Sequence, residues 1–155
     1  MNIPVIAGGG IGDARGFVAA LALGAEGVVM GTRFMVTKES LIHQNVKETI
    51  VNAKEADSMS VLRSLKAMER VFRNEVAEKV IEMENKGATL EELVPLIAGT
   101  KVREALEKGN MNVGILPCGQ VTGLINEVLS VKEVIDGIVD GARDILDRLT
   151  REIKA

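Results

Sequence analysis

The chain has 155 residues, of which 46% are hydrophobic and 26% are charged, and its formal net charge is −3. This length suffices for one domain with a core, but a complete (β/α)8 barrel takes roughly 250 residues. The negative net charge and the 2% aromatic content exclude the usual basic and base-stacking surfaces of nucleic-acid-binding proteins. The single cysteine excludes an internal disulfide and a cysteine-cluster metal site.

Two short apolar runs and a helical stretch between them open the chain. Residues 3–7 (IPVIA) and 27–30 (GVVM) have the composition of buried parallel strands. Asp13 stands where it can cap a helix, and Gly24 stands where that helix should end. Together these elements predict one right-handed βαβ unit with parallel strands.

From about residue 41 onward the pattern is helical. Apolar residues at three- and four-residue steps predict one long helix that ends at Lys86 and Gly87. The stripe consists of Leu62, Leu65, Met68, Phe72, Val76, Val80 and Met83. About 120 residues of mostly helical pattern therefore follow only two strands, and two strands cannot close a sheet by themselves.

Two capping boxes mark later helices. Thr89 with Glu92 predicts the start of a helix that Gly99 ends, and a shorter helical segment then runs to Gly109. Ser130 with Glu133 predicts the start of the last helix.

The longest uninterrupted apolar run, residues 17–23, is too short to span a membrane. No signal peptide precedes the first strand, so we expect a soluble cytoplasmic protein without a membrane partner.

Glycine-rich segments follow both expected strands. The sequence GGGIG occupies residues 8–12, and GTRF occupies residues 31–34. Backbone N–H groups of such loops bind phosphate where no Cβ atom intervenes, although tight turns without a ligand also use glycine. Two consecutive parallel strands end at the same edge, and in barrels the loops after strands seven and eight often hold a phosphate jointly. The sequence therefore favours a phosphate site.

Dinucleotide-binding and nucleotide-triphosphate motifs are absent from these loops. The spacing G-x-G-x-x-G fails because the residue three positions after Gly10 is Asp13. The second strand ends in Met30 and Gly31 and not in an acidic residue that would hold a ribose. No Gly-Lys-Ser/Thr sequence follows a glycine-rich loop. The phosphate site is therefore of another type.

The stretch IPVIAGGGIGDARGFVAALALGAEGVVMGTRF resembles the strand-seven to strand-eight segment of nitronate monooxygenases. Flavin-type enoyl-acyl-carrier-protein reductases share this segment closely. The similarity continues through HQNVKETIVNAKEAD and RVFRNEVAEKVIEMENKGATLEEL to the late CGQVTGLI. It implies an α/β fold, the C-terminal portion of an FMN-binding (β/α)8 TIM barrel. Residues 1–40 would form its last βαβ unit, and residues 41–155 a helical C-terminal segment that completes and flanks it.

The family resemblance assigns the FMN phosphate to both glycine-rich loops. Its contacts correspond to Gly9 and Gly10 in the first loop, and in the second to Val29, Met30, Gly31 and Thr32. The sequence departs from the family at Gly8, where alanine is more common. It also departs at Val29, where the family often has glutamine.

Other polar residues receive less support. In the family the catalytic histidine lies on an earlier barrel strand, and His43, the only histidine, does not match that position. Arg15 and Arg33 could neutralise a phosphate, but in the family they more often fix loop geometry. Cys118 fits a packed small residue better than a nucleophile. Gln120 is a candidate for the flavin pocket. The resemblance therefore places no catalytic residue and no metal ligand in this chain.

Three functions stay open at this point. The leading one is an FMN-dependent oxidoreductase of the nitronate monooxygenase type, which oxidises alkyl nitronates with dioxygen and is present here as a C-terminal fragment. The second is an NAD(P)H-dependent flavin enoyl-acyl-carrier-protein reductase, and the third is a non-catalytic truncated remnant. The substrate would be a nitronate or an enoyl thioester. Since open strand edges pair with other chains, we expect self-association or a complementary N-terminal barrel chain.

Overall fold

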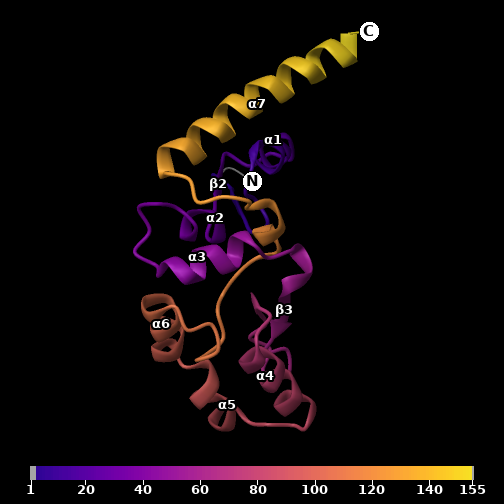
Figure 1. Ribbon diagram of the computed structural model, residues 1–155. Coiled ribbons are helices and arrows are strands. Elements are labelled where there is room, and N and C mark those ends of the chain that lie inside the picture. Colours follow the sequence, from indigo (N-terminus) through magenta and orange to yellow (C-terminus); the bar gives the residue numbers. More distant parts are fainter. Residues whose placement is uncertain (1–2, 155) are drawn as a thin grey trace.

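The computed structural model describes residues 3–154, which form two small sheets and a set of helices around them (Figure 1). In chain order the elements are β1 Ile6–Gly8, α1 Ala14–Ala22, β2 Gly27–Val29, α2 Thr32–Met35, α3 Gln44–Val51, the 3-10 helix η1 Glu55–Asp57, β3 Ser58–Val61, β4 Glu69–Phe72, α4 Glu75–Asn85, α5 Leu90–Ile97, α6 Gly99–Lys108, the 3-10 helix η2 Gln120–Leu124 and α7 Val131–Lys154.

The predicted βαβ unit is confirmed. β1 and β2 pair in parallel, and α1 connects them. Asp13 caps α1 by accepting hydrogen bonds from the backbone N–H groups of Arg15 at 3.0 Å and Gly16 at 3.2 Å. Gly24 follows the helix with φ +98°, a left-handed conformation that glycine adopts without a steric penalty. β1 begins later than the run 3–7 suggested, because Pro4 lacks the N–H group that a ladder needs.

One face of the β1–β2 sheet carries large residues opposite glycines. Ile6 pairs with Gly27, and Gly8 pairs with Val29. A Cβ atom on Gly8 would lie 2.7 Å from Cγ1 of Val29, so valine on one strand demands glycine on the other. Ile6 and Val29 are 57% and 61% exposed in residues 3–154. Alternating large and small residues on an inner face are typical of barrel interiors.

The predicted long helix over residues 62–83 is wrong in its first half. Residues 58–72 form an antiparallel hairpin, β3–β4, in which Ser58 pairs with Phe72 and Val61 with Glu69. Its turn contains Leu62 and Lys66 with φ near +60°, which no helix continues through. α4 begins only after Asn74, whose side-chain oxygen accepts from Ala77 N–H at 2.7 Å.

The apolar stripe does not form one helix, because most of its members reach one core from two different elements, while Phe72 of β4 packs against the other apolar cluster. Leu62 and Leu65 come from the hairpin turn, while Val76, Val80 and Met83 come from α4, and all five pack in the same cluster. Met68 is 67% exposed and belongs to no stripe. Three- and four-residue spacing across the turn was therefore coincidental, and the alternation in Ser58–Val61 was the better indicator of a strand.

The later helices begin and end close to the positions that the sequence predicts. Thr89 and Glu92 form the predicted capping box of α5, and Gly109 ends α6 in the left-handed conformation. Gly99, which was expected to end α5, is instead the first residue of α6, and α5 ends at Ile97. Two apolar clusters hold the molecule together. One gathers around Val46, Ile50, Leu116 and Ile125, and the other gathers around the hairpin, α4 and α5. Figure 1 shows these two regions along an elongated molecule, with α7 returning to pack on α1 at the far end from α5.

The N-terminus of α7 is held by the predicted box of Ser130 and Glu133. The Glu133 carboxylate accepts from the Ser130 hydroxyl at 2.6 Å and from Ser130 N–H at 2.7 Å. The same carboxylate forms an ion pair with Lys38, whose Nζ lies 3.0 Å from Oε2 of Glu133. The Ser130 hydroxyl, the Ser130 N–H group and Lys38 together lower the pKa of Glu133 to about 2.

This cap predicts an acid-dependent contribution to stability. Because the pKa of Glu133 falls from 4.5 to about 2 on folding, its stabilising effect is complete above the unfolded pKa and disappears as the pH falls through the folded one. Glu133→Gln keeps a capping side chain but removes the charge. We expect parent and variant to differ most in unfolding free energy near neutral pH and to converge near pH 2, as measured by denaturant titration. A difference that does not change with pH would contradict the assignment.

Among the residues described, no helix combines the length and the apolar character that crossing a bilayer requires. Within the same residues, no three histidine, cysteine, aspartate or glutamate side chains come together as a metal site.

Candidate functional site

The first glycine-rich loop leaves β1 in a conformation that depends on glycine. Gly9 and Gly10 have φ values of +95° and +72°. A Cβ atom built on either of them would meet no other atom within 4 Å, so both backbones face open space. Residues with a Cβ atom rarely adopt such φ values, and glycine has no side chain to shield its backbone. The loop can therefore bring its backbone close to a ligand.

The second loop, which follows the parallel neighbour β2, has the same open character at Gly31. No atom lies within 4 Å of the position that a Cβ atom on Gly31 would take. Thr32 is buried, and its hydroxyl oxygen accepts a hydrogen bond from Gly119 N–H at 3.0 Å. Met30 and Val29 precede these residues at the end of β2. The two loops therefore present open glycines at the same end of adjacent strands.

A third segment, η2 and the residue before it, supports both loops. Gly119 holds Thr32 of the second loop, and Val121 packs against Gly12 of the first. A Cβ atom on Gly12 would lie only 2.2 Å from Cγ2 of Val121, so any other residue there requires the Val121 side chain or one of the two segments to shift. Thr122 is fully buried, and its hydroxyl donates to the carbonyl of Gly119 at 2.6 Å.

Sequence reasoning named neither Gly119 nor Val121 as part of the site. The resemblance of CGQVTGLI to the family was the only signal for this segment, and it singled out Gln120. Gln120 is exposed at the first position of η2, next to the two residues that contact the loops. The loops are thus joined by residues about ninety to one hundred and ten positions further along the chain.

Arg15 and Arg33 do not face the open glycines. Arg15 Nε donates to the Asp13 carboxylate at 2.9 Å, which ties the arginine to the α1 cap. Arg33 is 5% exposed and donates from Nη2 to the carbonyls of Val36 at 2.8 Å and Glu127 at 3.0 Å. Its burial lowers the pKa of the guanidinium, and the charge of Glu127 opposes that effect. Both arginines thus maintain loop geometry.

A phosphate group fits the donor set that these loops offer. Asp13 already occupies the N–H groups of Arg15 and Gly16 at the start of α1, so that helix end has few donors left. The backbone of Gly9, Gly10 and Gly31 stays accessible, and each added Cβ atom would fill the space in front of it. Backbone cradles of this kind bind phosphate through N–H groups without a charged side chain.

His43 and Cys118 have structural roles. His43 is exposed and caps α3, with Nδ1 accepting from Asn45 N–H at 3.1 Å. A Cβ atom on Gly109 would lie 2.3 Å from that Nδ1, so Gly109 leaves room for the ring. Cys118 is buried against the Thr122 hydroxyl at 3.1 Å, and burial raises the pKa of its thiol, an effect that Thr122 and Arg70 only partly oppose. Neither side chain approaches the open glycines.

Comparison with known proteins gives the family. Residues 1–141 match the model of the family described as nitronate monooxygenase. The chain belongs to the nitronate monooxygenase family. A probable nitronate monooxygenase of Staphylococcus saprophyticus is 35% identical over 96% of this chain and 41% of its own length. A (3aS,4S,5R,7aS)-5-hydroxy-7a-methyl-1-oxo-octahydro-1H-indene-4-carboxyl-CoA dehydrogenase of Rhodococcus jostii is 32% identical over 96% of this chain and 52% of its own length.

Solved structures confirm the fold of this nitronate monooxygenase family member. FabK from Thermotoga maritima superposes with a TM-score of 0.90 at 39% identity, covering 98% of this chain and 48% of FabK. A nitroalkane oxidase from Streptomyces ansochromogenes superposes with a TM-score of 0.73 at 21% identity and covers 96% of this chain. The predicted fold, the C-terminal portion of a TIM barrel with a C-terminal helix, is therefore confirmed. The chain spans about half the length of the relatives it matches.

Proposed function

We propose that this chain holds the phosphate of FMN in an oxidoreductase of the nitronate monooxygenase type. The observation that carries the proposal is the open backbone of Gly9, Gly10 and Gly31 at the ends of two adjacent parallel strands. Membership of the nitronate monooxygenase family supports an oxidoreductase of the FMN type. The bound flavin would supply the redox chemistry, namely oxidation of an alkyl nitronate with dioxygen.

The residues of this chain would bind and orient the cofactor. Gly9 and Gly10 would donate backbone N–H groups from the first loop, and Gly31 and Thr32 would do so from the second. The backbones of Val29 and Met30 complete the proposed contacts. Gly119 and Val121 would keep the two loops at a constant separation, since they contact Thr32 and Gly12. We assign no proton-abstracting base to this chain, because His43 caps α3 and lies apart from the loops.

The inner face of the β1–β2 sheet indicates what kind of partner this chain binds. Ile6 and Val29 are both more than half exposed, and β1 and β2 pair with no further strand within residues 3–154. Apolar faces and open strand edges of this kind bind other protein surfaces. We therefore propose that the first six strand–helix units of a barrel, or another copy of this chain, cover this face.

An enoyl reductase is the second candidate. The sequence resembles flavin-type enoyl-acyl-carrier-protein reductases, and FabK from Thermotoga maritima is 39% identical to this chain. The substrate would then be an enoyl thioester, and NAD(P)H would reduce the flavin. A non-catalytic remnant is the third candidate, and it would retain no flavin.

Flavin content and two assays separate these functions. The purified protein is incubated with FMN and desalted, and its flavin absorbance is measured. Dioxygen uptake with an alkyl nitronate supports the first proposal, and NAD(P)H oxidation with an enoyl thioester supports the second. We expect neither activity from the 155-residue chain by itself, and both flavin binding and turnover after assembly with the first six units. His43→Ala should stay within a few-fold of the parent. Turnover that depends on His43 would refute the proposal.

A further inference from the structure

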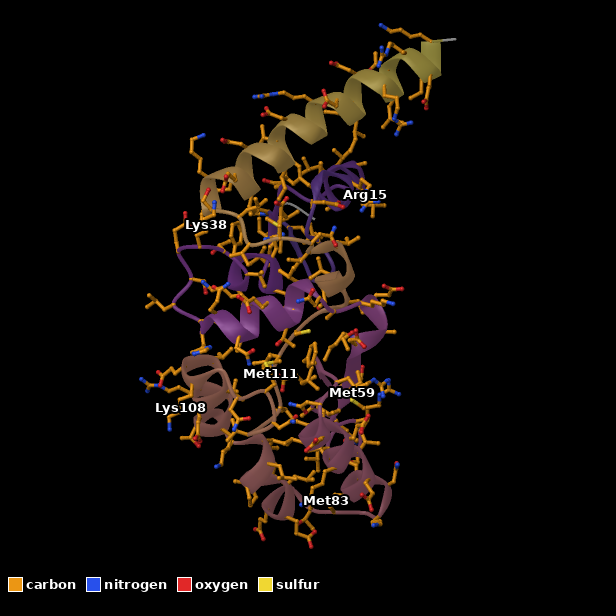
Figure 2. The ribbon with its side chains drawn as sticks, viewed as in Figure 1. Arg15, Lys38, Met59, Met83, Lys108 and Met111 are labelled. Atoms are coloured by element: carbon orange, nitrogen blue, oxygen red, sulfur yellow. The ribbon has the colours of Figure 1, made fainter. Side chains whose placement is uncertain are left out.

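A cavity of about 500 Å³ lies in the second region of the molecule, away from the two glycine-rich loops. It is bounded by the β3–β4 hairpin and the last turns of α4, and Met59, labelled in Figure 2, is one of its lining residues. Arg63, Arg70 and Arg73 all line it. Three guanidinium groups around one cavity are an unusual feature in a chain with a net charge of −3, and the function proposed above does not use them.

The positive charge in this cavity is only partly compensated by carboxylates. Within residues 3–154, neither Arg63 nor Arg70 forms an ion pair, and Arg73 reaches only Glu78, at 3.5 Å between two half-exposed side chains. In the part of the chain that the structure describes, Glu84 is the only carboxylate that lines the cavity. Its oxygens already accept from Leu62 N–H at 2.7 Å, Ser64 N–H at 3.0 Å and the Ser64 hydroxyl at 2.7 Å. These neutral donors leave the charge of Glu84 in place, so the three arginines and Glu84 together give the cavity a net positive charge.

Neighbouring groups orient this positive charge. Arg70 donates from one guanidinium nitrogen to the Ser58 hydroxyl at 3.1 Å, which positions the planar group at the cavity wall. Partial burial works against the charged form of Glu84, but the Ser64 hydroxyl, two backbone N–H groups and Arg63 lower the pKa of its carboxyl below the usual range. Glu84 thus stays ionised and keeps the Leu62–Ser64 turn in place. Arg63, which extends from that turn, is exposed and free to move toward a ligand.

We propose that this cavity binds the phosphate or pyrophosphate group of a nucleotide-type ligand. Arginine is the side chain best suited to phosphate, since its planar fork donates two parallel hydrogen bonds and keeps its charge. The volume falls in the range of small-molecule sites. Two ligands carry this chemistry in the context of the proposed function. One is a coenzyme A thioester, the substrate type in the name of the Rhodococcus relative, and the other is a nicotinamide nucleotide.

The path of the chain connects the cavity with the flavin loops. η1 directly precedes β3, which lines the cavity, and η1 packs against η2. A Cβ atom on Gly123 of η2 would lie 2.8 Å from Glu55 N, so these two segments are in close contact. Val121 of η2 in turn contacts the first glycine-rich loop. The inference rests on the proposed function only for this connection, since phosphate binding in the cavity needs no flavin.

Binding experiments test the inference directly. Coenzyme A, NADPH and inorganic pyrophosphate are titrated into the purified protein by isothermal calorimetry at low ionic strength. We expect one of the two nucleotides to bind and pyrophosphate to compete with it. Arg63→Gln and Arg70→Gln should each weaken binding about tenfold, as expected for one charge-assisted hydrogen-bonding group. Arg63→Gln is the decisive variant, because Arg63 is exposed and acts on its neighbour Glu84 through its charge, so its replacement should disturb the fold least.

Arg103→Gln is the matched control. It removes the same charge from the exposed face of α6, where Arg103 pairs with Glu107 at 2.7 Å, and it should bind like the parent. If coenzyme A binds and NADPH does not, the phosphate group in the cavity belongs to a coenzyme A thioester. If NADPH binds and coenzyme A does not, it belongs to a nicotinamide nucleotide. Absence of binding by both, unchanged affinity in Arg63→Gln, or equal weakening in Arg103→Gln would overturn the inference. A Gly10→Val protein that lacks flavin but still binds pyrophosphate separates this site from the flavin site.

Discussion

In the barrel assembled with the first six strand–helix units, replacing Gly10 by valine is expected to abolish flavin retention and to leave the helix content nearly unchanged. The valine side chain would enter the open space in front of the first loop, where no other atom lies within 4 Å. A phosphate oxygen and a β-branched side chain cannot share that space. The φ value of +72° adds strain of about 1–3 kcal/mol for a residue with a Cβ atom. Flavin absorbance after desalting, with circular dichroism on the same sample, measures both effects.

Gly87→Val is the control that distinguishes the effect of backbone strain from blockage of the phosphate site. Gly87 has a φ value of +80°, and a Cβ atom on it also meets nothing within 4 Å, but it follows α4 in the other region of the molecule. Both variants should therefore lose a similar part of their free energy of unfolding, and only Gly10→Val should lose flavin. If Gly10→Val retained as much flavin as the parent, the phosphate would not lie at this loop.

The second large effect is expected where Gly12 meets Val121. Gly12→Ala would place a Cβ atom 2.2 Å from Cγ2 of Val121, and overpacking of this kind destabilises a protein by about 1–3 kcal/mol. Since Val121 keeps η2 against the loop, we also expect weaker flavin retention. Val121→Ala removes the obstructing methyl group, and Cβ of residue 121 would lie 3.8 Å from the new atom, an ordinary contact.

A double-mutant cycle measures this contact. The pair Gly12→Ala with Val121→Ala should be less destabilised than the sum of the single variants, by about 0.5–3 kcal/mol. Gly99→Ala is the control, because a Cβ atom on this exposed first residue of α6 meets nothing within 4 Å. That change should stabilise the helix by up to about 1 kcal/mol. Additive effects at positions 12 and 121 would mean that the loop and η2 are not coupled.

Local chemistry in the sequence predicted much of the fold. Asp13, Thr89 with Glu92, and Ser130 with Glu133 cap helices in the structure as they were expected to do. These features depend on residues only two or three positions apart, so their geometry is nearly independent of the rest of the chain. The same holds for the two strands that end in glycine-rich loops. The FMN contacts assigned to these loops stay predictions.

The β3–β4 hairpin and the support of the glycine-rich loops were decided by tertiary structure. Periodicity records which residues are apolar but not which element presents them to the core, so Leu62 and Val80 could share a cluster without sharing a helix. The arginine-lined cavity is a similar case, since Arg63 and Arg70 meet only because the hairpin folds back.

The βαβ unit, the helix caps and the glycines of both loops follow from the amino-acid sequence, because each depends on neighbouring residues and on the steric limits of φ. The contacts of Gly119 and Val121 with the two loops follow from the tertiary fold, since these residues lie about ninety to one hundred and ten positions after the residues they contact. Such contacts form when the chain returns to bury apolar surface shared by distant segments, and no local pattern encodes the partner that a buried side chain will meet.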